Sequence, residues 1–231
     1  MFSVIIPVYN EEDNLSLLIK EIKLSLKYYK QFEVIFVNDC STDKSLQILN
    51  DEKKSFNFKI INNKSNFGQS YSTLVGIKNS IYNIIVTLDG DGQNNPEDIP
   101  MLLEFYLDSN DIFLVGGIRK KRKDNFTKII SSKIANFVRS KFLNDGCRDT
   151  GCSLKVFDKK IFLTFEYFNG IHRFLPSLFK GFGYKTYFLD VDHRKRMHGV
   201  SKYGTFLRLF NGLKDMIKVK RMINRNNKNK V

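Results

Sequence analysis

Cysteine and histidine are scarce in this chain of 231 residues, which has three of each. The odd number of cysteines and the lack of a CxxC pair argue against a disulfide framework and against a zinc knuckle. The histidines lack the HExxH spacing of zinc proteases, so we expect no zinc site. Unpaired cysteines fit a reducing compartment, and we expect the cytosol.

Long apolar runs are also missing. No stretch approaches the roughly 20 apolar residues that a membrane-spanning helix needs. The first residues, Met1-Phe2-Ser3-Val4, contain no basic segment and begin no long apolar core, so we expect no signal peptide. There is no GxxxxGK[ST] motif, and Gly181-Phe182-Gly183 does not continue into a dinucleotide-binding fingerprint. A kinase or a dehydrogenase is therefore not expected.

Acidic residues are outnumbered, 24 against 38 lysines and arginines, which gives a net charge of +14. Such a field favours anionic partners, namely nucleic acid, an acidic membrane surface or phosphorylated substrates. The basic residues are spread over loops and the tail, and no RNP-type or zinc-finger signature accompanies them, so we expect no nucleic acid partner. The length and the 42% hydrophobic content fit one globular domain with room for an appendage.

The chain does contain a regular alternation of short apolar runs and amphipathic stretches. We expect strands over 2–8, 32–37, 58–61, 84–87, 112–115, 154–156 and 184–191, and helices between the first five of them. This pattern predicts an α/β fold with a mostly parallel sheet covered by helices on both faces. Helical patterns also cover 126–142 and a final amphipathic segment up to Ile217. We expect one domain over 1–217 and a basic, disordered tail over 218–231.

Polar clusters follow three of these strands: Tyr9-Asn10-Glu11, Asn38-Asp39 and Asp89-Gly90-Asp91. Asn10 is also a residue type that caps helices. In open α/β sheets ligands bind beyond the carboxyl ends of the strands, so we expect the three clusters to converge on one site.

Two carboxylates one residue apart, with glycines that let the backbone bend, are hard oxygen ligands suited to Mg²⁺ or Mn²⁺. We interpret Asp89 and Asp91 as holding a divalent metal against the diphosphate of a nucleotide-sugar. The alternative interpretation is an acidic turn.

These clusters and two further motifs, Asn66-Phe67-Gly68 and Gly199-Val200-Ser201-Lys202, carry a family resemblance. The chain resembles family 2 glycosyltransferases of the GT-A type, and among them the dolichol-phosphate or polyprenyl-phosphate mannosyl- and glucosyltransferases. The resemblance extends to about Leu213 and implies a GT-A, Rossmann-like fold. It also implies metal-dependent, inverting transfer of a hexose from GDP-mannose or a UDP-sugar to a polyprenyl or dolichyl phosphate. Asn38 and Cys40 depart from the Asp and Gly of many relatives, which leaves the base preference open.

The resemblance also implies site residues, which we combine with the charged candidates around them. Binding of the nucleotide-sugar is expected from Pro7, Tyr9, Asn10, Glu11, Asp39, Asp89, Asp91, Gln93, Ser201 and Lys202. The metal ligands would be Asp89, Asp91 and Gln93. The acceptor phosphate would meet Arg119, Lys128, Ser132, Arg148 and Arg173, with Lys128 standing where many relatives have Arg. The catalytic candidates are Asp91, Asp149 and Arg196.

Transfer to a phosphate needs little base catalysis, because the acceptor is already anionic at neutral pH. The chemistry should rest on positioning and electrostatics. Asp149 would orient the acceptor or accept a proton; its alternative is a cap of the following segment. Arg173 would bind phosphate or pair with an acid. His172 and His193 are interpreted as structural residues.

The sequence also leaves two alternative functions to consider, and it bears on where the protein acts. A family 2 enzyme acting on a glycan hydroxyl in surface polysaccharide synthesis would need a general base, for which Asp149 is the candidate. A binding-only relative is disfavoured by the intact Asp89 and Asp91. A polyprenyl acceptor is membrane-bound, so we expect peripheral binding to the cytoplasmic face of a membrane through basic residues and amphipathic helices, with a possible membrane-anchoring partner protein.

Overall fold

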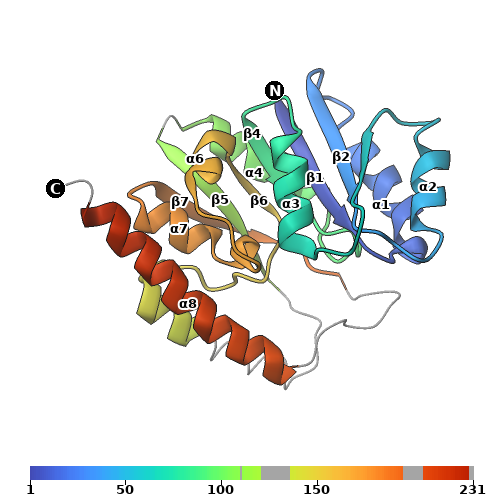
Figure 1. Cartoon of the computed structure of the whole chain (residues 1–231). Coiled ribbons are helices and arrows are strands. Elements are labelled where there is room, and N and C mark those ends of the chain that lie inside the picture. The colour runs from blue at the N-terminus through green and yellow to red at the C-terminus, as the bar shows by residue number, and fades with distance from the viewer. Residues whose placement is uncertain (110, 121–135, 195–204, 229–231) are drawn as a thin grey trace.

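The computed structural model describes residues 1–109, 111–120, 136–194 and 205–228, and its central feature is a seven-stranded sheet (Figure 1). The strands run in the spatial order β3-β2-β1-β4-β6-β5-β7. Neighbouring strands are parallel except around β6, which runs antiparallel to both β4 and β5. The predicted mostly parallel sheet is confirmed. The strands are β1 Phe2–Val8, β2 Phe32–Asn38, β3 Lys59–Asn62, β4 Ile84–Thr87, β5 Ile112–Arg119, β6 Lys155–Asp158 and β7 Lys185–Val191.

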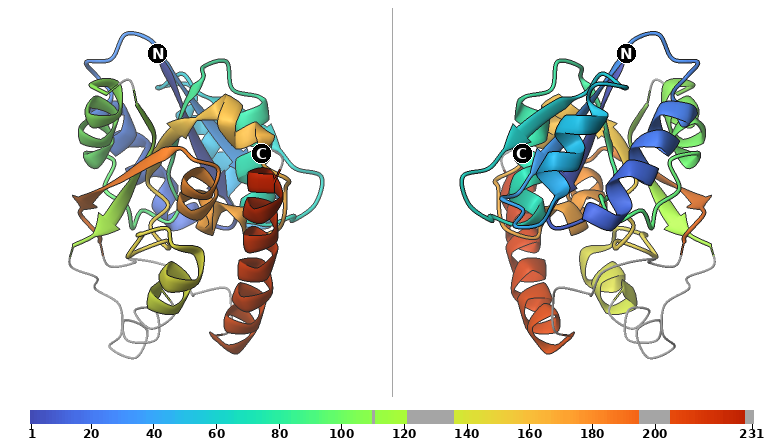
Figure 2. Two further views of the ribbon diagram at one scale, coloured as in Figure 1. Left: turned by 90° about the vertical axis from the view of Figure 1, so that its left-hand side faces the viewer. Right: turned by 90° about the vertical axis from the view of Figure 1, so that its right-hand side faces the viewer.

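Helices cover both faces of the sheet, as expected (Figure 2). One face packs against α1 Glu12–Ser25, α2 Ser45–Glu52 and α4 Asp98–Leu107. The other packs against α3 Gln69–Lys78, α6 Lys159–Thr164, the short 3₁₀ helix η1 Ile171–Arg173, α7 Leu175–Gly181 and α8 Thr205–Lys228. Alternation along the strands separates the two cores: Val4 and Ile6 face one, and Ile5 faces the other. Residues 136–143 form a further helical stretch.

The C-terminal helix α8 corrects one expectation. The segment from Lys218 was predicted to be disordered, but α8 continues to Lys228 without a break at residue 217. Val219, Met222 and Ile223 are buried against the sheet-facing core, at the i, i+3, i+4 spacing of one helix face. Gly181 of α7 allows this packing, because a Cβ there would lie 2.4 Å from Ile223 Cδ1. The prediction of disorder was wrong because it rested on the basic, Asn-rich composition of the segment. It overlooked the few apolar residues that lie on one face of the helix.

No helix in the described ranges combines the length and the apolar character that crossing a bilayer requires.

Candidate functional site

The acidic turn after β4 lies against the end of β1. Leu88 donates its backbone N–H to Ile5 O at 3.1 Å, which extends the contact of the two strands into the turn. A Cβ on Gly90 would lie 2.9 Å from Pro7 O, so only glycine allows this approach. The Gln93 N–H then donates to Asp91 Oδ1 at 3.1 Å. The turn therefore presents its acids at the carboxyl edge of the sheet, beside the partly buried Pro7 of β1 and Tyr9, which follows this strand.

Asp39 and Asp89 are joined through the first residues of α3. The Gly68 N–H donates to Asp39 Oδ2 at 2.7 Å, and the Gln69 side chain donates to Asp89 Oδ1 at 2.6 Å. Asp39 also accepts hydrogen bonds from Phe67 N and Asn63 Nδ2 and is only 3% exposed. The expected convergence of these two strand ends is thus observed. Both oxygens of the Asp39 carboxylate therefore accept hydrogen bonds from the loop before α3. The contact of Asp39 with the nucleotide base stays a prediction.

The loop after β1 is clamped to the loop after β2. Asn10 has a positive φ of 51° and exchanges hydrogen bonds with Thr42, and its backbone N–H donates to Ser41 Oγ. It does not cap α1, because Glu11 occupies the N-cap position and makes no side-chain cap bond. Glu11 is 8% exposed and accepts from Asn14 Nδ2 at 2.8 Å. These motif residues build the rim of the site.

The electrostatics of the acidic turn suit a divalent cation. Burial and the charge of Asp91 raise the pKa of Asp89 to about 7, against the opposing effects of Ser153, Lys155 and Arg119. Two carboxylates that repel each other in a partly buried site are relieved when a cation binds between them. Gln93 donates a hydrogen bond from its amide nitrogen to Arg194 O, so the oxygen of the same side chain is the atom that would ligate a cation.

The donor set is also the right size for Mg²⁺ or Mn²⁺. Within the described residues, no group of three or more His, Cys, Asp or Glu side chains is placed to hold a metal. An ion at Asp89 and Asp91 would therefore take its remaining ligands from Gln93, water and substrate phosphates, the environment that these cations prefer. The residues present fit such an ion.

A buried ion pair lies at the end of β5. Arg119 donates from Nε and Nη2 to the two carboxylate oxygens of Asp149, at 2.6 and 2.7 Å. A Cβ on Gly151 would lie 2.7 Å from Arg119 Nη2, so this glycine gives the guanidinium its room. Arg148 is exposed beside the buried Asp149. Two residues with separately predicted roles therefore form one unit.

Arg173 is paired with an acid, one of the two alternatives left open by its sequence context. Its Nη2 atom lies 3.2 Å from Asp215 Oδ2, which ties η1 to α8. Its role toward an acceptor phosphate stays a prediction. The predicted site residues Lys128, Ser132, Arg196, Ser201 and Lys202 lie outside the described part of the chain.

The sequence did not single out Lys155 as a functional candidate, and His172 was interpreted as a structural residue. Lys155 lies in β6 between the fully buried Leu154 and Val156 and is only 3% exposed. His172 Nδ1 lies 2.6 Å from Ser70 Oγ. The sequence did contain a signal for Lys155, because a charged residue inside an apolar strand is unusual and often has a function.

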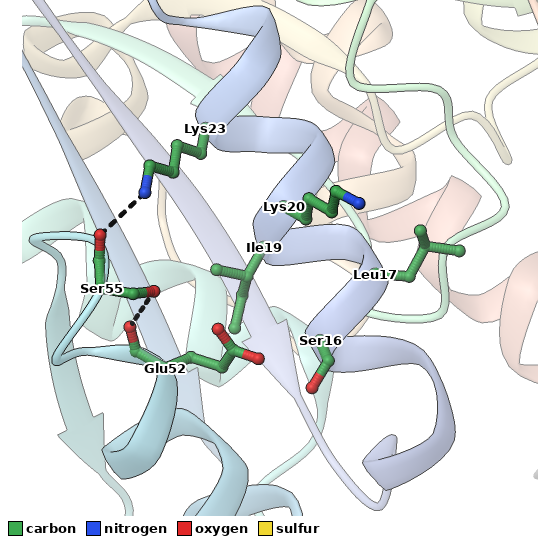
Figure 3. Close-up of a pocket in the computed structure, with 7 residues that line it drawn as sticks. All are labelled: Ser16, Leu17, Ile19, Lys20, Lys23, Glu52 and Ser55. Atoms are coloured by element: carbon green, nitrogen blue, oxygen red, sulfur yellow. Dashed lines mark hydrogen bonds between the residues drawn. The ribbon is translucent and has the colours of Figure 1, made fainter.

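A cavity of about 370 Å³ between α1 and α2 contains none of the predicted site residues (Figure 3). Lys23 closes one side of it by donating to Ser55 O at 2.9 Å. The cavity belongs to the contact between these two helices.

Comparison with known proteins agrees with this geometry. The sequence profile described as "Glycosyl transferase family 2" matches residues 3–165. The chain is 33% identical over 220 residues to the undecaprenyl-phosphate 4-deoxy-4-formamido-L-arabinose transferase of Pectobacterium carotovorum, covering 93% of this chain and 66% of the relative. It is also 33% identical over 225 residues to the dodecaprenyl-phosphate galacturonate synthase of Rhizobium johnstonii, covering 94% and 65%. The chain thus spans just under two thirds of the length of these relatives.

A solved structure extends the comparison to the fold. Glucosyl-3-phosphoglycerate synthase from Mycobacterium tuberculosis, crystallised with Mn²⁺, UDP and phosphoglyceric acid, superposes with a TM-score of 0.71 at 15% identity. The match covers 94% of this chain and 78% of that one. The predicted GT-A-type architecture is confirmed.

Proposed function

The chain belongs to glycosyl transferase family 2, and we propose that it transfers a sugar from a nucleoside-diphosphate sugar to a polyprenyl phosphate. The observation that carries the proposal is the acidic pair Asp89 and Asp91, held at the carboxyl edge of the sheet by Gly90 and Gln69. The names of both relatives above contain a polyprenyl phosphate, which supports the acceptor class. The net charge of +14 suits this reaction, because the donor and the acceptor both carry phosphate groups.

On the donor side, Asp89, Asp91 and Gln93 would hold Mg²⁺ or Mn²⁺. Bound there, the ion would neutralise charge on the departing diphosphate. The solved neighbour that contains Mn²⁺ and UDP supports this cofactor class without distinguishing the two metals. Gln69 orients Asp89 through its 2.6 Å hydrogen bond, so the carboxylate is positioned before a substrate arrives.

On the acceptor side, Arg119 is a cation near the acidic turn, since its charge acts on Asp89. Its two hydrogen bonds to Asp149 fix the plane of the guanidinium group. They therefore also fix the directions of the N–H groups that Arg119 could use to bind a phosphate. A phosphate acceptor attacks as an anion and needs only to be held in line, which gives inversion at the sugar carbon. A hydroxyl acceptor would need a general base, and Asp149 is poorly suited to that role because both of its carboxylate oxygens already accept hydrogen bonds from Arg119. This pairing favours the phosphate acceptor.

We also propose that the protein binds a membrane surface peripherally. On α8, the exposed Leu213 and Ile217 lie one turn apart, at 46% and 48% exposure. Basic side chains border them on the same helix: Lys214, Lys218, Arg221 and Arg225. Apolar anchors framed by basic residues suit an anionic leaflet, where each basic residue contributes about 1 kcal/mol. The cytoplasmic face and a membrane-anchoring partner remain predictions.

The test is a panel of nucleotide-sugars, including GDP-mannose, UDP-glucose and UDP-glucuronate, each with Mn²⁺ or Mg²⁺. Every donor is incubated with and without a short polyprenyl phosphate, and release of the nucleoside diphosphate is measured. The proposal requires turnover that depends on both the metal and the lipid phosphate. Turnover that is equally fast with a free sugar hydroxyl as acceptor would refute the acceptor assignment.

A further inference from the structure

Lys155 is a cation in the protein interior that forms no ion pair within the described residues. Its side chain is 3% exposed, and its Nζ donates a hydrogen bond to the carbonyl oxygen of Cys152. It forms no ion pair with any carboxylate in the described ranges. Burying an ammonium group costs free energy unless it is paired with a negative charge and fully hydrogen-bonded. The carbonyl oxygen of Cys152 accepts from one of the three N–H donors of Lys155, so two donors can still bind other oxygen atoms. Such a group fits a ligand that supplies the missing oxygen atoms.

Strand pairing shows which way Lys155 projects. It lies opposite Thr87 of β4, two residues before Asp89, and opposite Gly116 of β5. Its neighbours Val156 and Phe157 belong to the two different cores, and side chains alternate along a strand. Lys155 therefore lies on the Phe157 side of the sheet, the face covered by α3 and η1.

The first turn of α3 brings two other polar side chains to the same place. Gln69 donates to Asp89 Oδ1 at 2.6 Å, and Ser70 contacts His172 Nδ1 at 2.6 Å while accepting from Gly170 N at 2.8 Å. Consecutive residues thus tie the acidic turn to η1. Burial lowers the pKa of His172, and the positive charges of Arg173 and Lys155 act in the same direction.

We propose that Lys155, on the same face of the sheet as Gln69 and His172, forms the floor of the donor-sugar subsite and donates hydrogen bonds to an oxygen substituent of the transferred sugar. This inference rests on the proposed function: if Asp89 and Asp91 bind the diphosphate, the sugar joined to that diphosphate extends into the space bordered by Asp89. A hydroxyl or a carboxylate could supply the oxygen. The positive charge makes a carboxylate the stronger partner.

The test compares sugar-bearing and sugar-free nucleotides. Lys155→Met keeps a long side chain and removes the ammonium; because it also removes an uncompensated buried charge, we expect it to fold with no loss of thermal stability. Calorimetric titration with Mn²⁺ should give unchanged affinity for the free nucleoside diphosphate. Affinity for the matching nucleotide-sugar should fall about 10- to 100-fold, the value of a hydrogen bond to a charged group. A larger loss for UDP-glucuronate than for UDP-glucose identifies a carboxylate partner, and equal losses identify a hydroxyl.

Lys159→Met is the matched control. Lys159, the first residue of α6 and directly after the far end of β6, donates to Ser80 O at 2.6 Å, so this variant should bind both ligands like the wild type. Lys155→Arg serves as a second variant, which keeps the charge and should retain diphosphate binding while altering the preference among sugars.

Equal weakening of the free diphosphate and the nucleotide-sugar in Lys155→Met would overturn the inference, because the contact would then be with the diphosphate. Unchanged affinity for both would overturn it as well, because the lysine would then be only structural. If the wild type binds no nucleotide at all, the proposed function itself fails, a result distinct from either of these.

Discussion

Arg119 and Asp149 form a two-bond ion pair at the end of β5, and the Arg119 backbone N–H adds a third bond to the same carboxylate at 3.2 Å. The two side chains are only 13% and 7% exposed. A carboxylate that accepts two hydrogen bonds from one guanidinium fixes the orientation of that arginine. The role of Asp149 that fits best is therefore to position Arg119.

The first prediction concerns this pair. Removing one partner breaks a buried ion pair, so Asp149→Ala and Arg119→Ala should each lower the free energy of unfolding by about 3–5 kcal/mol. The double variant should lose less than the sum of the two, which urea denaturation measures. The exposed pair Lys185 and Asp111 provides the control, because its removal should change stability little. Strict additivity for Arg119 and Asp149 would contradict the coupling.

The second prediction concerns the acidic turn. Asp91→Asn keeps the shape of the side chain and removes a charged ligand, so turnover should fall about 100- to 1,000-fold. Binding of Mn²⁺ in the presence of a nucleoside diphosphate, followed by electron paramagnetic resonance, should weaken in parallel. Asp51→Asn, on the outer surface of α2, removes a carboxylate that forms an exposed ion pair with Lys54 and should alter neither measurement. Full Mn²⁺ binding by Asp91→Asn would remove the metal assignment.

The third prediction concerns the outer surface of α8. Ile217→Asp places a charge on the exposed apolar pair of this helix and should reduce flotation with anionic liposomes at low salt. Leu24→Asp on α1 is the control, because Leu24 is similarly exposed, 55% against 48%, but lies on a different helix from the proposed membrane surface. Both variants should keep the wild-type melting temperature. Equal flotation of Ile217→Asp and the wild type would exclude α8 as the docking helix.

The fourth prediction concerns the three thiols. Burial raises the pKa of Cys152 to about 11 and also raises the pKa of Cys147, so both stay protonated and shielded at neutral pH. Cys40 is partly exposed. We expect a disulfide reagent that reports thiols by colour to detect one fast-reacting group in the native protein and none in Cys40→Ser. Two fast thiols in the wild type would show that the loop over 147–152 opens readily.

The fifth prediction is a dependence of stability on pH. Burial, and then the charges of Arg173 and Lys155, lower the pKa of His172 from 6.5 to about 3. The unfolded chain takes up a proton near the higher value and the folded chain only near the lower one. The contribution of His172 is therefore complete above about pH 6.5 and is lost progressively as the pH falls toward 3. His172→Gln should flatten the fall of melting temperature over this range, and an unchanged slope would contradict the assignment.

Much of the architecture could be predicted from local patterns. The apolar runs from Phe2 and Ile84 became central strands, and the helical spacing of Leu15, Leu18 and Ile22 became a buried helix face. These patterns are readable because strand and helix periods repeat within a few residues. The acidic turn could be placed at the carboxyl edge for the same reason, since it directly follows β4.

Pairings between distant residues could not be predicted in this way. Arg119 and Asp149 are thirty positions apart and meet because β5 and β6 are neighbours in the sheet. The sequence by itself determined the alternation of strands and helices, the excess of positive charge and the acidic turn, because each is a property of a short stretch or of the composition. Only the tertiary structure decided that Asp149 is bound to an arginine, that α8 is packed through Ile223, and that Lys155 is buried without a carboxylate partner among the described residues. Those facts depend on which surfaces the folded chain removes from water, and burial is what makes a charge or an apolar group costly or favourable.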